Sequence, residues 1–542
     1  MRFAPVVLAT LCAATLFIAL DQPGFLDWRE ARDAEVTREL VLDSEALTPL
    51  YGSAALYEKP VLAYAPEVWL SRFTSAAQRA PDPLRSRELR ALFAVFLVLG
   101  TTSLAARHFG LRAAWFSAAI LATSLGLPLA ARTDGTQLLG TLLGWAGCAG
   151  LADAIFGRPP GRDARLTVAY VALGAALASV GPLAALWPLG GLALYLALAR
   201  EPGGWRAARP LAGLALVAGV GLPWYGAMVE RHGIPFLAHA AVFPYAVERP
   251  GPWFAGPVLM LSFLVVGFFP WAALLPAATL HAATGRRTAA LRAGHPAQSD
   301  AERREEGMAH FLVACLLAAL APIALYPGPP LPAALPALPA AALLCGRFLD
   351  HLFETPARIA RPFTRATRML ALLGTAAAVM LALIAARLRG AAPDLRLLAS
   401  LLLVTSWAPF LADFMGRPRL AALLMALPVT LGTPLVSARV LPAMEEYLNA
   451  RRVAEAMTAV APRLAPLVMA ENPPPSLRLY GAHNLVVAEP LAPTLTRMRA
   501  ADGMIYLAFR PGREREVAGA LGSPLEILLR TASLVLARAR PG

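Results

Sequence analysis

The chain has 542 residues, of which 57% are hydrophobic and only 15% are charged, and its formal net charge is +14. Soluble domains contain about 45–50% apolar and about 25% charged residues, so this composition excludes a soluble multidomain enzyme, a disordered chain and a disulfide scaffold. It favours a polytopic membrane protein with some extramembrane mass. Of the 49 basic residues 48 are arginine, and Lys59 is the single lysine.

Apolar stretches long enough to cross a hydrocarbon core of about 30 Å as helices recur along the whole chain. We predict thirteen spans, near residues 3–20, 89–106, 113–131, 136–156, 166–181, 183–199, 210–229, 256–276, 308–326, 331–349, 369–386, 397–413 and 420–438. The fifth and sixth are separated only at Val180-Gly181-Pro182, so twelve is the alternative count. The first is followed by Asp21-Gln22-Pro23 rather than a small-residue cleavage site, which favours a retained anchor over a signal peptide.

Basic residues in short loops predict the orientation of the spans. With the N-terminus inside, the inner loops carry most of the arginines that flank the spans. Residues 21–88 and 440–542 then lie on the outer face. The positive charge is therefore largely an orientation signal, and we expect no nucleic-acid partner.

The C-terminal region is predicted to form a small α/β domain, 440–542, beside a membrane domain 1–439 that includes the loop 21–88. Its helix-like stretches are Met444 to Leu464 and Glu514 to Leu521, and its strand-like ones are Leu477 to Tyr480, Asn484 to Ala488 and Met504 to Phe509. The four cysteines all lie inside predicted spans, which indicates buried apolar residues rather than disulfide or metal partners. They are Cys12, Cys148, Cys315 and Cys345.

Ionisable residues concentrate in the first outer loop. The stretch 27–40 contains Asp27, Glu30, Arg32, Asp33 and Glu35. On a helix, Asp27 and Glu30 share one face while Arg32 and Glu35 lie on another. Two interpretations stay open for this stretch alone, namely a solvated amphipathic helix on the membrane surface and a catalytic carboxylate cluster.

The single lysine lies in the same loop, in Tyr57-Glu58-Lys59-Pro60. An ammonium acts on a phosphate as a compact point charge, so lysine and arginine are not equivalent at such a site. The alternative interpretation is that the single lysine persists by chance. Cations for a phosphate and a carboxylate to deprotonate an attacking hydroxyl are the groups that a lipid-linked phosphate substrate requires. Lys59 and the carboxylates together therefore predict such a site at the outer membrane surface.

These residues resemble motifs of the integral-membrane glycosyltransferases of the aminoarabinose transferase and protein O-mannosyltransferase group, which share the GT-C architecture. Members typically read Asp-Glu-x-Arg-Tyr-Ala-Glu and, further on, Tyr-x-Glu-Lys-Pro. Here Glu30, Arg32, Ala34 and Glu35 match the first motif, and Glu58-Lys59-Pro60 matches the second. Further matches follow in the expected order, at Arg87, Arg132-Thr133-Asp134, Pro223-Trp224-Tyr225, Phe269-Pro270-Trp271 and Leu335 to Ala340.

The resemblance implies an all-α GT-C membrane fold with a C-terminal α/β domain in the periplasm, the N-terminus being cytoplasmic in a bacterial inner membrane. The implied activity is transfer of a sugar from a polyprenyl-phosphate donor to a lipid or protein acceptor on the periplasmic face, as in lipopolysaccharide modification. We expect a monomer, assign no metal ligands and leave open whether a divalent cation takes part. The implied catalytic candidates are Glu30, Asp27 and Asp33, and the implied substrate-binding residues are Arg32, Glu35, Tyr57, Glu58, Lys59 and Asp134. Among these, Arg32 and Lys59 would hold the phosphate.

The sequence departs from the family pattern at several positions. The usual catalytic Asp is Arg29, whose guanidinium cannot act as a base. Asp33 stands where a Tyr is usual, Val180-Gly181-Pro182 replaces Lys-Gly-Pro, and the segment 326–333 lacks a usual basic residue. Either one of Asp27, Glu30 and Asp33 provides the base, or the chain is a catalytically inactive lipid-phosphate-binding or assembly protein on the same scaffold.

Three further alternatives are weighed against this interpretation. A transporter would need ionisable residues near the membrane midplane, where Asp153, Asp413 and His310 do not lie. His232 and His239, with Glu230 and Glu248, fit no strong metal-binding template, so interfacial hydrogen bonding is the default interpretation. Asp134 is typical of a helix cap as well as of a site residue.

Overall fold

The computed structural model describes residues 3–27, 29–42, 47–52, 54–73, 81–157, 161–199, 202–240, 255–290, 299–325, 332–354, 356–460, 467–469, 472–481, 485–487 and 504–540. The chain forms two compact units. The helical unit comprises Met1–Ala19, Leu56–Pro66 and Arg87–Ala438. The mixed unit comprises Leu20–Ala55, Glu67–Ser86 and Arg439–Gly542.

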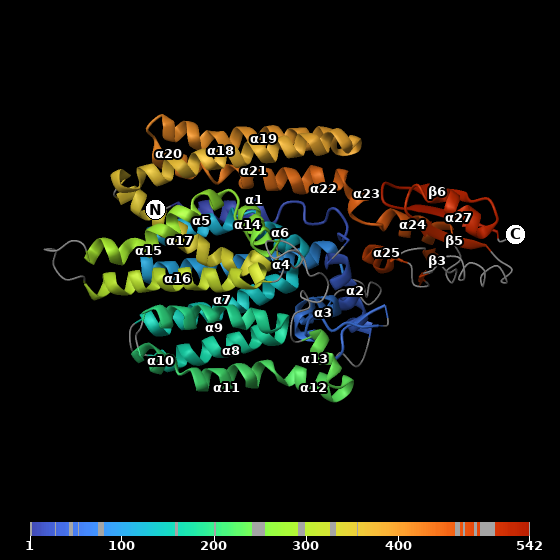
Figure 1. Cartoon of the computed structure of the whole chain (residues 1–542). Coiled ribbons are helices and arrows are strands. Elements are labelled where there is room, and N and C mark those ends of the chain that lie inside the picture. The colour runs from blue at the N-terminus through green and yellow to red at the C-terminus, as the bar shows by residue number, and fades with distance from the viewer. Residues whose placement is uncertain are drawn as a thin grey trace. The chain divides into compact units, whose positions relative to one another are not determined.

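The described part of the helical unit consists of helices and short 3₁₀ turns (Figure 1). Its elements are α1 (Ala4–Leu16), η1 (Val61–Ala63), most of α4 (Pro83–Phe109), α5 (Leu111–Ala122), α6 (Gly126–Thr133), α7 (Gly135–Phe156), α8 (Arg162–Val180), α9 (Pro182–Ala199), α10 (Pro202–Ala208), α11 (Pro210–Gly221), α12 (Pro223–His232), α13 (Pro235–Ala240), α14 (Ala255–Gly267), η2 (Trp271–Ala273), α15 (Leu275–Ala290), α16 (Asp300–Leu325), η3 (Pro332–Ala337), α17 (Leu338–Glu354), α18 (Pro356–Arg387), η4 (Arg389–Ala391), α19 (Ala392–Phe414), α20 (Pro418–Leu424) and α21 (Leu427–Leu435).

Many of these helices are long and apolar enough to cross a membrane. Within the described ranges eight qualify, or up to ten if each of two bent pairs forms one span. The structure therefore confirms a polytopic, mostly helical protein but does not confirm the predicted count of thirteen. One reason is that α1 has only 13 residues, about 20 Å at 1.5 Å per residue, which is shorter than the hydrocarbon core.

Helix breaks occur where the sequence carries Gly and Pro. At Gly181, whose φ is +106°, α8 ends and Pro182 begins α9, so the ambiguous pair of predicted spans is two separate helices. The predicted span 113–131 is the pair α5 and α6, which meet at 50°. The predicted span 210–229 is likewise bent by 50° between Gly221 and Pro223, because Pro cannot donate the backbone hydrogen bond that would continue the helix.

Glycines allow neighbouring helices of this unit to approach closely. On α7, a Cβ at Gly140 would collide with Val180 of α8, and one at Gly147 would collide with Leu173. A Cβ at Gly174 would lie 2.7 Å from the Val220 Cβ of α11. Small residues at such crossings are how membrane helices gain packing contacts without a hydrophobic driving force between them.

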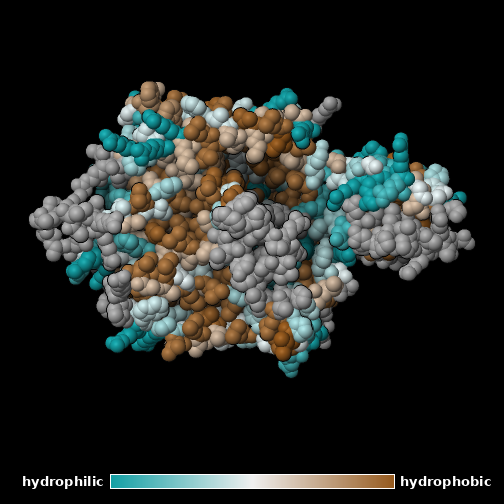
Figure 2. All heavy atoms as spheres, viewed as in Figure 1, coloured by the Kyte–Doolittle hydropathy of each residue, from teal (hydrophilic) through white to brown (hydrophobic). Residues whose placement is uncertain are grey.

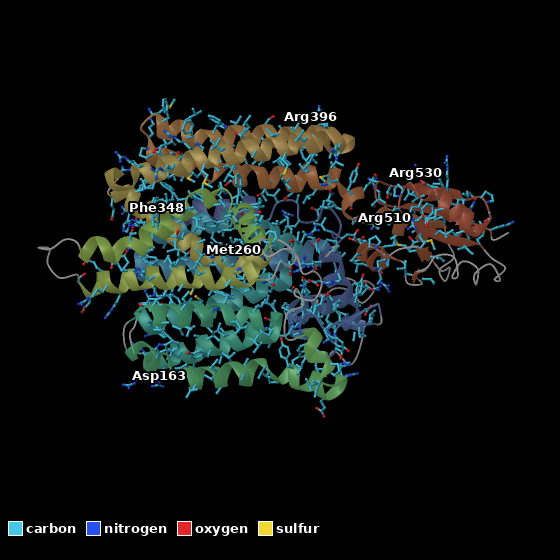
Figure 3. All side chains as sticks on the ribbon, viewed as in Figure 1. Asp163, Met260, Phe348, Arg396, Arg510 and Arg530 are labelled. Carbon is cyan, nitrogen blue, oxygen red and sulfur yellow. The ribbon has the colours of Figure 1, made fainter. Side chains whose placement is uncertain are left out.

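The surface of the helical unit has the polarity expected at a membrane. Figure 2 shows hydrophobic side chains across the visible face of its helices and hydrophilic ones gathered at the left-hand helix ends. Asp163 near the start of α8 and Arg396 near the start of α19 point away from the helices at opposite ends of the bundle (Figure 3).

The mixed unit joins part of the first loop with the C-terminal region. From the loop come α2 (Arg29–Leu42), the two-stranded pair β1 (Leu50–Tyr51) and β2 (Ala54–Ala55), and most of α3 (Ala65–Phe73). From the C-terminal region come the end of η5 (Val436–Val440), whose first three residues belong to the helical unit, and α22 (Leu441–Ala443), α23 (Glu445–Leu448), α24 (Arg451–Val460), β3 (Leu467–Met469), α25 (Pro475–Tyr480), β4 (Leu485–Val487), β5 (Ile505–Phe509), α27 (Glu514–Leu521), β6 (Glu526–Arg530) and β7 (Val535–Ala539).

A five-stranded sheet organises the C-terminal part of this unit, in the order β4-β3-β5-β7-β6. β3 is parallel to β4 and β5, and β7 is antiparallel to β5 and β6. Because side chains alternate along a strand, Tyr506 and Ala508 pack on the face that α24 and α25 cover, while Leu507 and Phe509 pack on the face of α27. The prediction of a small α/β region is confirmed.

One local prediction here is wrong. Leu477 to Tyr480 alternates like a strand, but the segment is the helix α25. Pro475 occupies the first turn of that helix, where its missing N–H costs nothing. The predicted helix 444–464 is also divided, into α23 and α24, on either side of Asn449.

Candidate functional site

Lys59 is buried in the helical unit. It follows β2 and precedes η1, and it is 5% exposed. Its Nζ donates a hydrogen bond to the Thr136 hydroxyl at 2.7 Å and lies 3.9 Å from Asp134 Oδ1. The single lysine thus meets two residues at the first turn of α7, more than seventy positions along the chain.

Asp134 is the N-cap of α7 and is 1% exposed. Its Oδ1 accepts the Gln137 backbone N–H at 3.0 Å and the Thr136 hydroxyl at 2.8 Å. An N-cap side chain normally accepts a hydrogen bond from a first-turn backbone N–H that has no partner within the helix. Asp134 therefore caps the helix and also contributes a carboxylate beside Lys59, so the two interpretations of this residue are compatible.

Arg90 brings a second cation to the same turn. It is 1% exposed, and its Nη1 donates to the Arg132 carbonyl at 3.4 Å. Its side chain crosses directly over Gly135, where a Cβ would lie 2.6 Å from Arg90 Nε. Glycine at position 135 therefore gives the guanidinium its path across the start of α7.

The start of α7 is consequently rich in buried positive charge. Arg132, two residues before Asp134, is also buried, at 5% exposure, and it donates to the Ala19 carbonyl at 3.2 Å. The N-terminus of the 22-residue α7 adds a partial positive charge of its own. Cations and a helix N-terminus together form the environment in which proteins bind phosphate.

The residues before Lys59 attach this segment to α12 and α13. The Tyr57 hydroxyl lies 3.3 Å from His232 Nδ1, and its ring stacks edge-on against His232 and Phe236 at centroid distances of 5.3 Å. Glu58 is half-buried. No group of three or more potential metal ligands occurs in the described ranges, and His232 has the hydrogen-bonding role that the default interpretation gave it.

In the mixed unit, α2 carries the predicted carboxylates, and they are buried. Glu30, Asp33 and Glu35 are 1%, 3% and 1% exposed. Arg29 and Arg32 on the same helix are half-buried. A solvated surface helix would expose its acids, so that interpretation of the stretch is wrong.

Two of the candidate bases hold backbone groups. Glu30 Oε2 accepts the Leu26 N–H at 2.9 Å, which closes the start of α2. Asp27 Oδ1 accepts the Ser476 N–H of α25 at 2.8 Å. Burial raises the pKa of the Asp27 carboxyl, and the bonds from Ser476 oppose that rise.

A second group of charges surrounds the C-terminal half of α2. Arg38 pairs with Glu35 at 2.6 Å, and the Gly52 N–H donates to Glu39 at 2.7 Å. Burial raises the pKa of Glu39, and the Gly52 N–H opposes that rise. The Arg478 guanidinium of α25 lies over the Tyr51 ring, 5.5 Å from its centroid.

The predicted site residues therefore fall into two sets. Lys59, Tyr57, Glu58 and Asp134 belong to the helical unit, and Asp27, Glu30, Arg32, Asp33 and Glu35 belong to the mixed unit. Sequence reasoning missed Arg90 and Thr136. Arg90 lies at the start of the predicted span 89–106. A charged residue inside a membrane span is costly and usually functional, so its position alone could have marked Arg90 as a site candidate.

Several residues of the sequence analysis lie outside the described ranges. They are Glu248 in the proposed metal alternative and most of the segment 326–333, and the side chain of His239 is likewise outside them. Val180-Gly181-Pro182 is described and forms the break between α8 and α9, with Gly181 supplying the positive φ.

No family model and no curated protein matches the sequence. Among solved structures, ArnT from Cupriavidus metallidurans matches in the apo state and bound to undecaprenyl phosphate, each with a TM-score of 0.76 and 18% identity over 98% of this chain and 97% of ArnT. An Archaeoglobus fulgidus oligosaccharyltransferase matches at a TM-score of 0.44 and 11% identity, over 95% of this chain and 70% of that one.

The match to ArnT extends over nearly all of both chains, including the C-terminal sheet region, while the identity is low. The resemblance predicted from the loop motifs is thereby confirmed at the level of the fold. This chain has the fold of the aminoarabinose transferase ArnT, a GT-C glycosyltransferase, and shares 18% sequence identity with it.

Proposed function

We propose that this protein is a membrane glycosyltransferase that moves a sugar from a polyprenyl-phosphate donor to a lipid or protein acceptor. The observation that carries the proposal is the buried contact of Lys59 with Thr136 at the N-terminus of α7. It is supported by the fold shared with an ArnT structure bound to undecaprenyl phosphate.

In the proposed reaction, an acceptor hydroxyl attacks the anomeric carbon of the sugar. The bond between that carbon and the phosphate oxygen breaks, and polyprenyl phosphate leaves with the bonding electrons. Lys59, Arg90 and the α7 N-terminus would stabilise the negative charge that develops on the leaving phosphate. Because Thr136 both accepts from Lys59 and donates to Asp134, it would hold the ammonium in position before the donor arrives.

The proton of the acceptor hydroxyl needs a base, and we assign this role to a carboxylate of the α2 region. Glu30, Asp27 and Asp33 are the candidates, with Glu30 favoured by its match to the family motif. Arg32, Glu35 and Tyr57 would contribute to substrate binding, and Glu58 would orient Lys59. A carboxylate acting as a general base must come within hydrogen-bond reach of the acceptor hydroxyl.

We further propose the cellular setting that the span pattern and the resemblance imply. The protein would be a monomer in a bacterial inner membrane with its N-terminus in the cytoplasm. Residues 21–88 and the domain 440–542 would lie in the periplasm, where an acceptor such as a lipopolysaccharide precursor is available. The positive-inside distribution of arginine supports this orientation.

The test is radiolabelled sugar transfer in proteoliposomes with a panel of polyprenyl-phosphate sugars. We expect transfer from at least one donor by the wild type and none by a Lys59→Ala, Glu30→Ala double variant. Arg396→Ala is the matched control, because Arg396 is exposed on α19 and should be dispensable. Equal transfer by the wild type and the double variant would overturn the assignment.

Arg29, at the position where the family carries its catalytic Asp, favours a second candidate function. In that case the chain binds polyprenyl phosphate without turnover. The two functions differ in one measurement: an inactive binder retains undecaprenyl phosphate in a filter assay, with Lys59 required, yet transfers no sugar from any donor. Arg29→Asp would then give no gain of activity.

A further inference from the structure

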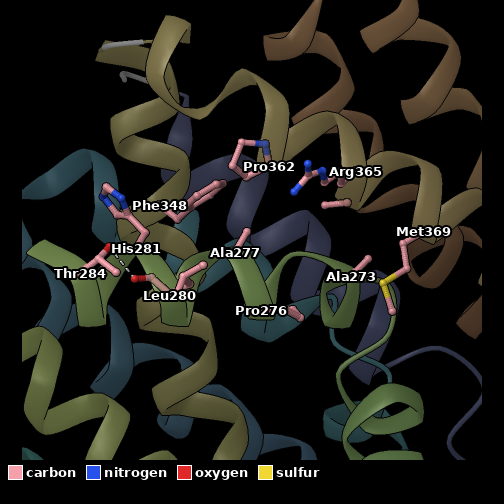
Figure 4. A pocket seen from close by; sticks show the side chains of 11 residues that line it. Ala273, Pro276, Ala277, Leu280, His281, Thr284, Phe348, Pro362, Arg365 and Met369 are labelled. Atoms are coloured by element: carbon pink, nitrogen blue, oxygen red, sulfur yellow. Dashed lines mark hydrogen bonds between the residues drawn. The ribbon is translucent and has the colours of Figure 1, made fainter.

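A cavity lies between α15, α17 and α18 of the helical unit, away from the residues described above. Its volume is about 410 Å³, which is within the range of about 300–1,000 Å³ for small-molecule sites. The wall is mainly apolar, with Ala277 and Leu280 on α15, Phe348 on α17 and Met369 on α18 (Figure 4). Arg365 is its single charged lining residue.

The α18 side of the cavity is amphipathic. Pro362, Ala366 and Met369 line it at helical spacing, and Arg365 lies beside them. Arg361 and Arg368 flank Arg365 at four and three positions along the helix, and all three arginines are exposed. The sequence has no Asp or Glu between Glu354 and Asp394, so α18 supplies no carboxylate to neutralise them.

These arginines differ from others at the same end of neighbouring helices. Arg347 of α17 pairs with Glu305 at 2.8 Å, and Arg112 of α5 pairs with Asp350 and Glu354. Within the part of the chain that the structure describes, Arg365 makes no hydrogen bond or ion pair. Its charge is available to a ligand, and Figure 4 shows its guanidinium directed toward the cavity.

The length of α18 places the arginines at the depth of lipid headgroups. The helix has 32 residues, or about 48 Å, whereas the hydrocarbon core is about 30 Å thick. The apolar part that begins at Met369 is long enough to fill that core, so the preceding turns extend beyond it. Leu280 in the cavity wall and Leu372 further along α18 are 65% and 69% exposed, as expected of side chains that face lipid.

We propose that this cavity binds an anionic phospholipid, whose headgroup phosphate pairs with Arg365 and whose acyl chain enters the apolar space. Basic pockets between transmembrane helices bind anionic headgroups in this way. The arginines belong to a loop end that the sequence predicts to be cytoplasmic, where anionic lipids are abundant. The inference does not rest on the proposed transferase activity.

Native mass spectrometry of the delipidated full chain would test the proposal with phosphatidylglycerol and phosphatidylethanolamine of the same acyl chains. We expect tighter binding of phosphatidylglycerol. Arg365→Glu should weaken it about thirtyfold, because each charge near a headgroup contributes about fivefold and the reversal also adds repulsion. Arg396→Glu, the matched reversal on α19, should change it less than twofold.

A cavity-filling variant tests the acyl-chain part. Ala277→Phe should weaken phosphatidylglycerol binding about tenfold, and inorganic phosphate should not compete with the lipid, since it lacks the chain. Equal binding of the two lipids by the wild type would overturn the proposal without any variant. So would equal effects of Arg365→Glu and Arg396→Glu, or full competition by inorganic phosphate.

Discussion

The two units use buried charge in opposite ways. In the helical unit, the start of α7 brings buried Lys59 to Asp134, and buried Arg90 reaches the Arg132 carbonyl beside them. In the mixed unit, α2 buries Glu30, Asp33 and Glu35. Buried charges of one sign are costly unless they are compensated.

The compensation differs between the units. Asp27 and Glu30 accept backbone N–H groups of their own unit, so these carboxylates help to build the fold that contains them. Lys59 instead binds the Thr136 hydroxyl, and Arg90 passes over a glycine. A cation held by a hydroxyl can exchange that partner for a phosphate, whereas substitution of a carboxylate that accepts a backbone N–H lowers the stability of the fold.

The largest expected effect concerns Lys59. We expect Lys59→Ala to lower kcat/KM for sugar transfer on the order of a thousandfold, because truncation of one partner in a buried charged contact costs about 2–5 kcal/mol. Steady-state kinetics in proteoliposomes would measure it.

Lys59→Arg is the informative companion variant. A guanidinium is larger than an ammonium and differs in geometry, and Lys59 is only 5% exposed, so we expect no more than partial activity. Full activity of Lys59→Arg would show that position 59 needs a cation but not specifically a lysine.

The second effect concerns Gly135. Its Cβ would lie 2.6 Å from Arg90 Nε, so Gly135→Ala should displace the guanidinium and raise KM for the polyprenyl-phosphate donor about tenfold, the loss of about 1.4 kcal/mol of binding. Gly100→Ala on α4 is the matched control, because its Cβ meets nothing within 4 Å. If both variants behave alike, Arg90 does not contribute to donor binding.

A third prediction concerns stability in the mixed unit. Asp27→Ala removes the acceptor of the Ser476 N–H and should lower the free energy of unfolding of that unit by about 1–2 kcal/mol. Asp27→Asn keeps an acceptor and should cost less. Chemical denaturation monitored on the C-terminal sheet would compare them, and equal stability of the Ala variant and the wild type would show that this contact is not structural.

The same residue predicts a pH dependence. Burial raises the pKa of Asp27, so the folded unit holds the proton more tightly than the unfolded chain. The stability that Asp27 contributes is therefore present at pH below the ordinary Asp pKa and is lost as the pH rises through the raised value. Asp27→Asn should flatten this part of the pH profile of thermal unfolding.

The smallest expected effect is that of Tyr57→Phe. It removes one hydrogen bond to His232 at 3.3 Å and keeps the ring contacts with His232 and Phe236. We expect a loss below about 1 kcal/mol and near-normal transfer. A large loss of kcat with unchanged thermal stability would instead place the Tyr57 hydroxyl at the substrate.

Sequence reasoning succeeded where a local pattern is governed by a local cause. Hydropathy identified α7, α8, α9 and α19, since each must present an apolar surface. The segment 514–521 is a helix and 504–509 contains a strand, as the periodicity predicted. The periodicity gave the wrong prediction for Leu477 to Tyr480. There Pro475 in the first helical turn and the Ser476 N–H that donates to Asp27 favour a helix over the strand-like alternation.

The candidate site was predicted in part. Lys59 and Asp134 were named from motifs, and the structure brings them to the same helix turn. Arg90 and Thr136 were not named, because neither belongs to a motif and both act through packing at the start of α7. Contacts between residues far apart in the chain depend on how the helices pack, which periodicity does not encode.

The amino-acid sequence by itself determined that this is a polytopic membrane protein with a small α/β region. The bilayer thickness sets the length of each apolar span, and a strand with one buried face alternates apolar and polar residues, so both features can be read from hydropathy. It also singled out Lys59, because one lysine among 49 basic residues is visible without a structure. Only the tertiary structure decided that the acids of α2 are buried and that Arg90 crosses Gly135. Burial and close approach are properties of packed surfaces, and they arise only when distant segments meet.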